Sequence, residues 1–249
     1  MTPALVATFA FVSIVTGAAV GLLLGKVLPD HHLDSGSKDV VRLSMGMIAT
    51  MTALVLGLVT ASAKSSFDAD DAAVKHTAAG VLTLDRMLAD YGPETQPIRE
   101  SIRSSVEAKV DQVFGDKIAT TPANLHNTEG DSIANALLAL APSTAAQTWY
   151  RSRALDVAAD VLQSRWIILN GTATVPTLFL IVIICWLTVL FGSFGLFAPR
   201  NGTVIGALLI CALSVALSIF LILEMDDPFG GVMRISDAPL RHALAHIGR

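Results

Sequence analysis

The sequence predicts an all-α integral membrane protein: four transmembrane helices, with a helical cytoplasmic layer between spans two and three. Hydrophobic residues make up 53% of the 249 residues, and charged residues only 15%. A soluble domain carries about 25% charged residues. Two stretches without any charge, 175–197 and 202–223, are each long enough to cross a hydrocarbon layer of roughly 30 Å as a helix.

The break between these two stretches predicts a tight reversal of the chain. Residues 198–202 read Ala-Pro-Arg-Asn-Gly, and Pro, Asn and Gly are turn residues. We therefore expect residues 175–224 to form an antiparallel transmembrane hairpin. Cys185 and Cys211 both lie within the predicted spans, so we interpret them as packing residues and not as a disulfide or a metal site.

Residues 1–63 are predicted to hold the first transmembrane pair. The apolar stretch 4–28 is longer than the core of a typical signal peptide and is interpreted as a retained span. Its Gly17, Gly21 and Gly25 recur every four residues, a pattern that lets another helix approach closely. A short polar loop over 29–42 would lead to the second span, residues 43–63.

The second span is rich in small and hydroxyl side chains. Such a helix either packs tightly on its neighbours or lines an aqueous path, and the sequence leaves both readings open. A small-residue stripe runs through Ala49, Ala53, Gly57 and Ala61. If the helix lines a pore, the candidate lining residues are Ser44, Ile48, Thr52, Val55, Val59 and Ser62.

Residues 64–174 are predicted to be a helical region outside the membrane. No breaker follows the second span, so its helix should run on to Gly92-Pro93, with Asp68, Asp70 and Asp71 on a solvated face. A second helix should run from Pro97 to Phe114, followed by a loop over 115–130 and a short helix over 131–141. Ser143 is expected to cap the next helix. These first two helices are predicted from apolar residues at helical spacing: Val74, Val81, Leu84, Leu88 and Tyr91 in the first, and Ile98, Ile102, Val106, Val110 and Val113 in the second.

An acidic group marks the point where the last span ends and the tail 225–249 begins. It consists of Glu224, Asp226 and Asp227. Three readings stay open: a polar helix end paired with arginine, a cation clasp, or an acidic ring at a pore entrance. Lys64, near the membrane edge where the second span ends, could instead draw anions.

The distribution of basic residues predicts the orientation. Four spans place both termini and residues 64–174 on one side. That side carries Lys64, Lys75, Arg151, Arg153, Arg165, Arg234 and Arg241, and the other side carries Lys26, Lys38, Arg42 and Arg200. The positive-inside tendency makes the first side cytoplasmic in a multi-pass protein of the cell membrane. A net charge of −4 argues against a nucleic-acid partner.

Several blocks resemble the bestrophin-like family of four-span bacterial membrane proteins. They include SMGMIATMTALVLGLVTASAKSSFD, LDRMLADYGPE, WLTVLFGSFGLFAPRNGTV and LILEMDDPF with the following RIS. The resemblance implies similarity to the bestrophins, pentameric anion channels with cytoplasmic termini and a calcium clasp of acidic residues after the last span. Here Pro228 interrupts the short acidic group, and the second span lacks the bulky apolar neck residues of bestrophins.

We therefore expect a homo-oligomeric ion channel in the lipid bilayer, pentameric by resemblance and favouring anions, with calcium as the one cofactor to test. The alternative is a non-conducting scaffold or signalling protein whose cytoplasmic helices bind a partner. A coupled transporter would need buried ionisable residues or broken helices within the spans, and neither is visible. No metal-ligand spacing, nucleotide loop or nucleophile motif indicates an enzyme.

Overall fold

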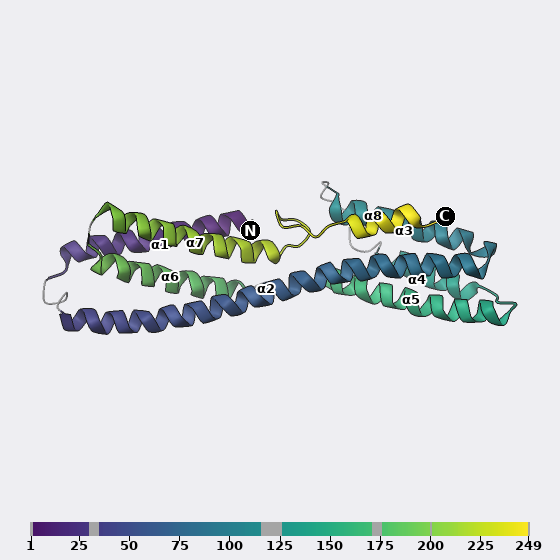
Figure 1. Ribbon diagram of the computed structural model, residues 1–249, viewed down its shortest axis with the longest axis horizontal. Helices are drawn as coiled ribbons and strands as arrows, with labels where there is room; N and C mark the ends of the chain where they lie inside the picture. The colour runs from purple at the N-terminus through teal and green to yellow at the C-terminus, as the bar shows by residue number, and fades with distance from the viewer. Residues whose placement is uncertain (1, 30–34, 116–125, 171–175, 200, 249) are drawn as a thin grey trace. The chain divides into compact units, whose positions relative to one another are not determined.

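The computed structural model describes residues 2–29, 35–115, 126–170, 176–199 and 201–248, and in these ranges all regular structure is helical. Four of the helices are long and apolar enough to cross a membrane. This confirms the predicted four-span all-α fold. The helices are α1 (Pro3–Val27), α2 (Ser35–Tyr91), α3 (Gln96–Phe114), α4 (His126–Ala139), α5 (Ala145–Asn170), α6 (Thr177–Phe197), α7 (Gly202–Met225) and α8 (Ala238–His246) (Figure 1).

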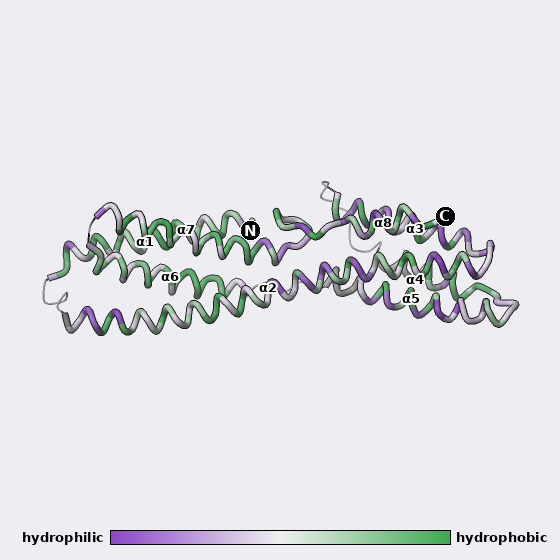
Figure 2. Tube along the Cα trace, viewed as in Figure 1, coloured by the Kyte–Doolittle hydropathy of each residue, from purple (hydrophilic) through white to green (hydrophobic). Residues whose placement is uncertain are grey.

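The chain divides into two compact units. Unit 1 comprises Met1–Ser66 and Ala173–Asp227, and unit 2 comprises Phe67–Thr172 and Pro228–Arg249. Unit 1 contains the predicted membrane spans, and Figure 2 shows its helices α1, α6 and α7 as mostly hydrophobic along their length. The helices of unit 2 alternate between hydrophobic and hydrophilic residues, the pattern of amphipathic helices that bury one face.

In the region of the predicted hairpin of unit 1, α6 ends at Phe197 and α7 starts at Gly202. Asn201 caps α7, because its side-chain Oδ1 accepts a hydrogen bond from the Val204 backbone N–H at 2.9 Å. The cap satisfies one of the amide groups that the first turn of a helix leaves without an intrahelical partner.

Small residues bring α1 and α6 into close contact. A Cβ added at Gly17 would lie 2.5 Å from the Thr188 carbonyl oxygen, and one at Gly21 would overlap the backbone of Gly192. Gly17 and Gly21 of the predicted glycine stripe therefore pack against α6. Thr188 Oγ1 donates to the Ile184 carbonyl at 2.7 Å, so in its 2.9 Å hydrogen bond with Ser13 it must be the acceptor.

The helix of the second span does run on without a break, as predicted, and α2 ends at Tyr91. The next residue, Gly92, has φ +146°, a backbone conformation that other residues rarely adopt. The predicted loop over 29–42 is wrong for its second half, because α2 already begins at Ser35. The first turns of α2 are polar and lack the apolar periodicity from which a helix is predicted in a sequence.

Unit 2 is built around one apolar core, and the stripes predicted for its first two helices form it. Val81, Leu84 and Leu88 of α2 pack with Ile98 and Ile102 of α3. Further along, a Cβ on Gly80 would lie 2.5 Å from Cγ2 of Val161, so α2 and α5 also pack closely. The core is completed by residues from α4, α5 and the C-terminal end: Leu137, Ala154, Val157, Ala158 and Ile247.

A buried ion pair ties α2 to α3 within unit 2. Arg99 donates from Nε to Asp85 Oδ1 at 2.7 Å and from a terminal nitrogen to Oδ2 at 3.0 Å. Asp85 Oδ2 also accepts from the Gly248 backbone N–H at 3.3 Å. The hydrogen bond to Asp85 raises the pKa of Arg99 above its usual value. One carboxylate thus joins α2, α3 and the C-terminal end.

The structure corrects three expectations about unit 2. α4 begins at His126, inside the predicted loop. The cap of α5 is Thr144 and not Ser143: Thr144 Oγ1 accepts from the Gln147 N–H at 3.1 Å, while Ser143 donates to the Gln147 side chain. Asp70 is 7% exposed, so it does not belong to a solvated face.

The tail beyond α7 also holds structure that the sequence did not indicate. α8 packs against α3, and Ala243 and Ile247 are fully buried. α8 has only nine residues, with a histidine at its centre. Its apolar pattern is therefore too short to distinguish a helix from an irregular polar tail in the sequence.

Candidate functional site

The membrane-crossing part of α2 is the candidate site, and its surface has three different flanks. Successive residues of an α-helix are rotated by about 100°, so residues three, four and seven apart share a flank. The buried flank contains Thr52, Val59 and Ala63, which are 4%, 9% and 2% exposed. This flank packs against the rest of the same chain.

The six predicted pore-lining residues do not share one accessible surface in the single chain. Thr52 and Val59 are buried, Ile48 and Val55 are half-buried, and Ser44 and Ser62 are exposed. The Thr52 hydroxyl donates to the Ile48 carbonyl at 2.8 Å and is therefore satisfied within its own helix. Their role in lining a pore stays a prediction.

A second flank of α2 is exposed and carries only small side chains, which we call the small-residue flank. Its members, which lie within about 40° of one line along the helix, are Gly46, Thr50, Ala53, Gly57 and Thr60, and Lys64 follows on the same side. A Cβ on Gly46 or Gly57 would meet no atom within 4 Å. The Thr50 and Thr60 hydroxyls donate to the carbonyls of Gly46 and Leu56, at 2.9 and 2.7 Å. Because these donors are used, the oxygens face the surroundings as acceptors.

The third flank is bulky and apolar. It carries Met47, Met51 and Leu58, which are 64%, 46% and 68% exposed. Leu43 and Leu54, at 82% and 72%, lie at its border with the small-residue flank. Side chains of this kind suit lipid or the side of another membrane helix. The two exposed flanks of α2 therefore differ in bulk and polarity.

The first turns of the span also border a pocket of about 380 Å³ within unit 1. Arg42, Gly46 and Ala49 of α2 face Phe194 and Phe197 of α6 there, and Val204 of α7 contributes to the wall. The pocket separates this end of α2 from α6. Sequence periodicity could not show this separation, because it predicts which residues share a helix face but not which helix packs against that face.

Comparison with known protein families identifies the family of this chain. A family model described as the bestrophin-like domain matches residues 10–240. The chain belongs to the bestrophin-like family. No curated protein and no solved structure was found to match the chain. The match spans all four membrane helices and most of unit 2, so both units belong to the bestrophin-like domain.

The acidic group at the end of α7 was the candidate calcium clasp of this bestrophin-like chain. Glu224 is 4% exposed, and its backbone carbonyl accepts from the Asp227 N–H at 3.3 Å. Glu224, Asp226 and Asp227 all have interaction partners. In the described part of the chain, no three His, Cys, Asp or Glu side chains come together to hold a metal ion. Calcium takes 6–8 oxygen ligands, so this group does not fit the ion within one chain, and we derive no calcium-dependent step.

Proposed function

We propose that the protein is a homo-oligomeric ion channel in which copies of α2 surround a shared aqueous axis. The resemblance to bestrophins suggests five subunits and a preference for anions. The proposal rests on the family membership and on one structural feature, the small-residue flank of α2.

This flank supports the proposal because it is left uncovered within one chain. Only 11% of the α2 span is buried, against 39% for α6 and 28% for α1. The absence of a side chain at Gly57 leaves room beside the helix, which water and ions can occupy if copies of α2 surround an axis. A ring of subunits that turns this flank inward would create a lumen lined by small side chains and by the oxygens of Thr50 and Thr60.

The charges along the helix favour anions at one end of such a lumen. No residue between Leu43 and Ala63 is charged, and the exposed Lys64 follows on the small-residue flank. A ring of lysines at a pore entrance raises the local concentration of anions. We further propose that unit 2 and both termini are cytoplasmic, because this side holds seven of the basic residues near the spans and the opposite side holds four.

The experiment that tests this proposal is the current through purified protein in a planar bilayer under a KCl gradient. We expect steps of current whose reversal potential lies near that of chloride. Gly57→Leu, on the small-residue flank, should lower the conductance, whereas Leu58→Phe, on the apolar flank, should leave it unchanged.

The mass of the complex in nanodiscs gives the second readout. A ring of subunits with current supports the channel. A monomer, or an oligomer that carries no current in any salt tested, contradicts the channel and favours a scaffold whose small-residue flanks only pack helices.

A further inference from the structure

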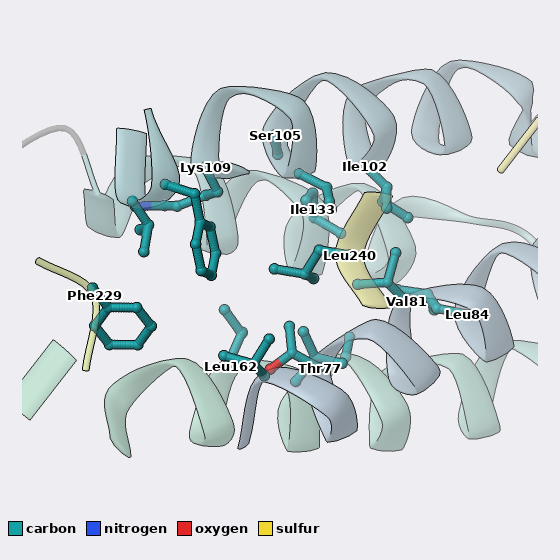
Figure 3. Close-up of a pocket in the computed structure, with 16 residues that line it drawn as sticks. Thr77, Val81, Leu84, Ile102, Ser105, Lys109, Ile133, Leu162, Phe229 and Leu240 are labelled. Carbon is teal, nitrogen blue, oxygen red and sulfur yellow. The ribbon is translucent and has the colours of Figure 1, made fainter. Parts of the chain in front are cut away.

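Unit 2 contains a partly open cavity that the proposed channel does not use. Its volume is about 160 Å³, and its walls are almost entirely apolar. Helices α2, α3, α4, α5 and α8 contribute to it, as does Phe229 from the segment between α7 and α8. Figure 3 shows Ser105 and Lys109 across the cavity from Thr77 and Leu162.

The size of the cavity indicates a ligand of one ring. An apolar cavity of about 150 Å³ stays dry and takes up benzene, because water would lose hydrogen bonds there that the walls cannot replace. The walls of this cavity are of the same kind, with Val81, Ile102 and Leu162 among them. A compact apolar molecule would restore the contacts that the wall atoms lack.

One polar group in the wall is without a partner. The Thr77 hydroxyl oxygen has less than 1 Å² accessible to solvent and makes no hydrogen bond. Other threonines of α2 are satisfied: the Thr83 hydroxyl donates to the Ala79 carbonyl at 2.8 Å. A buried hydroxyl without a partner is unfavourable and requires an explanation. Threonine in a helix populates two χ1 rotamers, and rotation exchanges its methyl and hydroxyl groups.

Charge narrows the class of ligand further. None of the described residues that line the cavity is acidic, and the ammonium group of the one lining cation, Lys109, already donates to Gln112 Oε1 at 3.3 Å. A cationic ligand would therefore be buried among apolar groups without a counter-ion, which is strongly unfavourable. An anionic ligand would be desolvated by the same walls and would have to compete with Gln112 for Lys109.

We propose that this cavity is a binding site for a neutral molecule of about one ring that carries a hydroxyl group, which hydrogen-bonds to Thr77. The ligand fills the apolar volume, and its hydroxyl gives Thr77 the partner that the protein alone does not supply. The site lies within unit 2 and does not depend on ion conduction.

The test uses the full chain in nanodiscs and two probes, 4-fluorophenol and fluorobenzene, observed by ¹⁹F NMR. We expect both probes to bind and the phenol to bind about five- to tenfold more tightly, the effect of one hydrogen bond. Thr77→Val should reduce this ratio to near one and leave fluorobenzene binding unchanged. Thr83→Val, on the same helix but exposed, is the matched control and should keep the ratio.

Filling the cavity separates specific binding from partition into lipid. Val106→Phe and Leu162→Phe place a ring in the cavity from α3 and from α5, and each should abolish the binding of both probes. Circular dichroism and thermal unfolding select the filled variants that remain folded. Equal probe signals in the original and a folded filled variant would overturn the site. An unchanged ratio in Thr77→Val would overturn the role of the hydroxyl group.

Discussion

Replacing Gly21 by alanine should separate α1 from α6 and destabilise unit 1. The added Cβ would lie 2.8 Å from the Gly192 carbonyl carbon and 2.9 Å from the Leu196 nitrogen, and it would overlap the Gly192 oxygen. Non-bonded carbon contacts need about 3.5 Å, so the helices must move apart by roughly 0.6 Å or more.

The displacement sets the size of the expected effect. A radial gap of about 0.5–1 Å removes a quarter to a half of each dispersion contact across the interface. It also stretches the 2.9 Å hydrogen bond between Ser13 and Thr188, and such bonds between membrane helices contribute about 0.6 kcal/mol. Together with the strain of overpacking, we expect a loss of about 1–3 kcal/mol in the free energy of unfolding.

Reversible unfolding in mixed detergent micelles, followed by tryptophan fluorescence, measures this loss. Gly206→Ala in α7 is the matched control, because a Cβ there meets no atom within 4 Å. It should be neutral or slightly stabilising. If the two variants unfold alike, the close approach of α1 and α6 does not hold the spans together.

Three further predictions concern unit 2. Asp85→Ala leaves Arg99 buried without its carboxylate, so thermal or urea unfolding should show a loss of about 3–5 kcal/mol; a loss below 1 kcal/mol would contradict the buried pair. Burial raises the pKa of Asp70 above 3.8 because it disfavours the charged carboxylate in the folded state. The contribution of Asp70 to the free energy of unfolding therefore falls as pH rises from 3.8 through the raised pKa. Asp70→Asn should therefore be the more stable protein at neutral pH and lose this advantage below pH 3.8, and a constant difference across a pH titration would contradict the assignment. Thr77→Val removes a buried hydroxyl without a partner and should raise stability by about 1 kcal/mol, whereas Thr83→Val should not.

The parts of this fold that depend on long patterns were predictable from the sequence. Uncharged runs of about 20 residues predict spans on their own, since lipid imposes length and apolarity. The four-residue spacing of Gly17 and Gly21 predicted a close helix contact, although only the structure showed α6 as the partner. The heptad-like spacing from Val74 to Leu88 likewise predicted the face of α2 that forms the core of unit 2.

The candidate site was less predictable, because a pattern does not say what covers a face. Thr52 and Val59 lie on the stripe that the sequence offered to a lumen, yet they are buried against their own chain. Asp70 lies among three acidic residues that suggested a solvated face, although its position four residues before Val74 places it on the apolar stripe of α2. The cavity of unit 2 depends on four separate helices and the tail, so no local signal exists for it.

Cysteine modification during current recording tests the inward orientation of the small-residue flank most directly. Cys185 and Cys211 are free and exposed, so both are first replaced by alanine. A charged, water-soluble thiol reagent should then block the current of Gly57→Cys irreversibly and leave that of Leu58→Cys unchanged. Block of Leu58→Cys alone, or of neither variant, would contradict a lumen formed by the small-residue flank of α2.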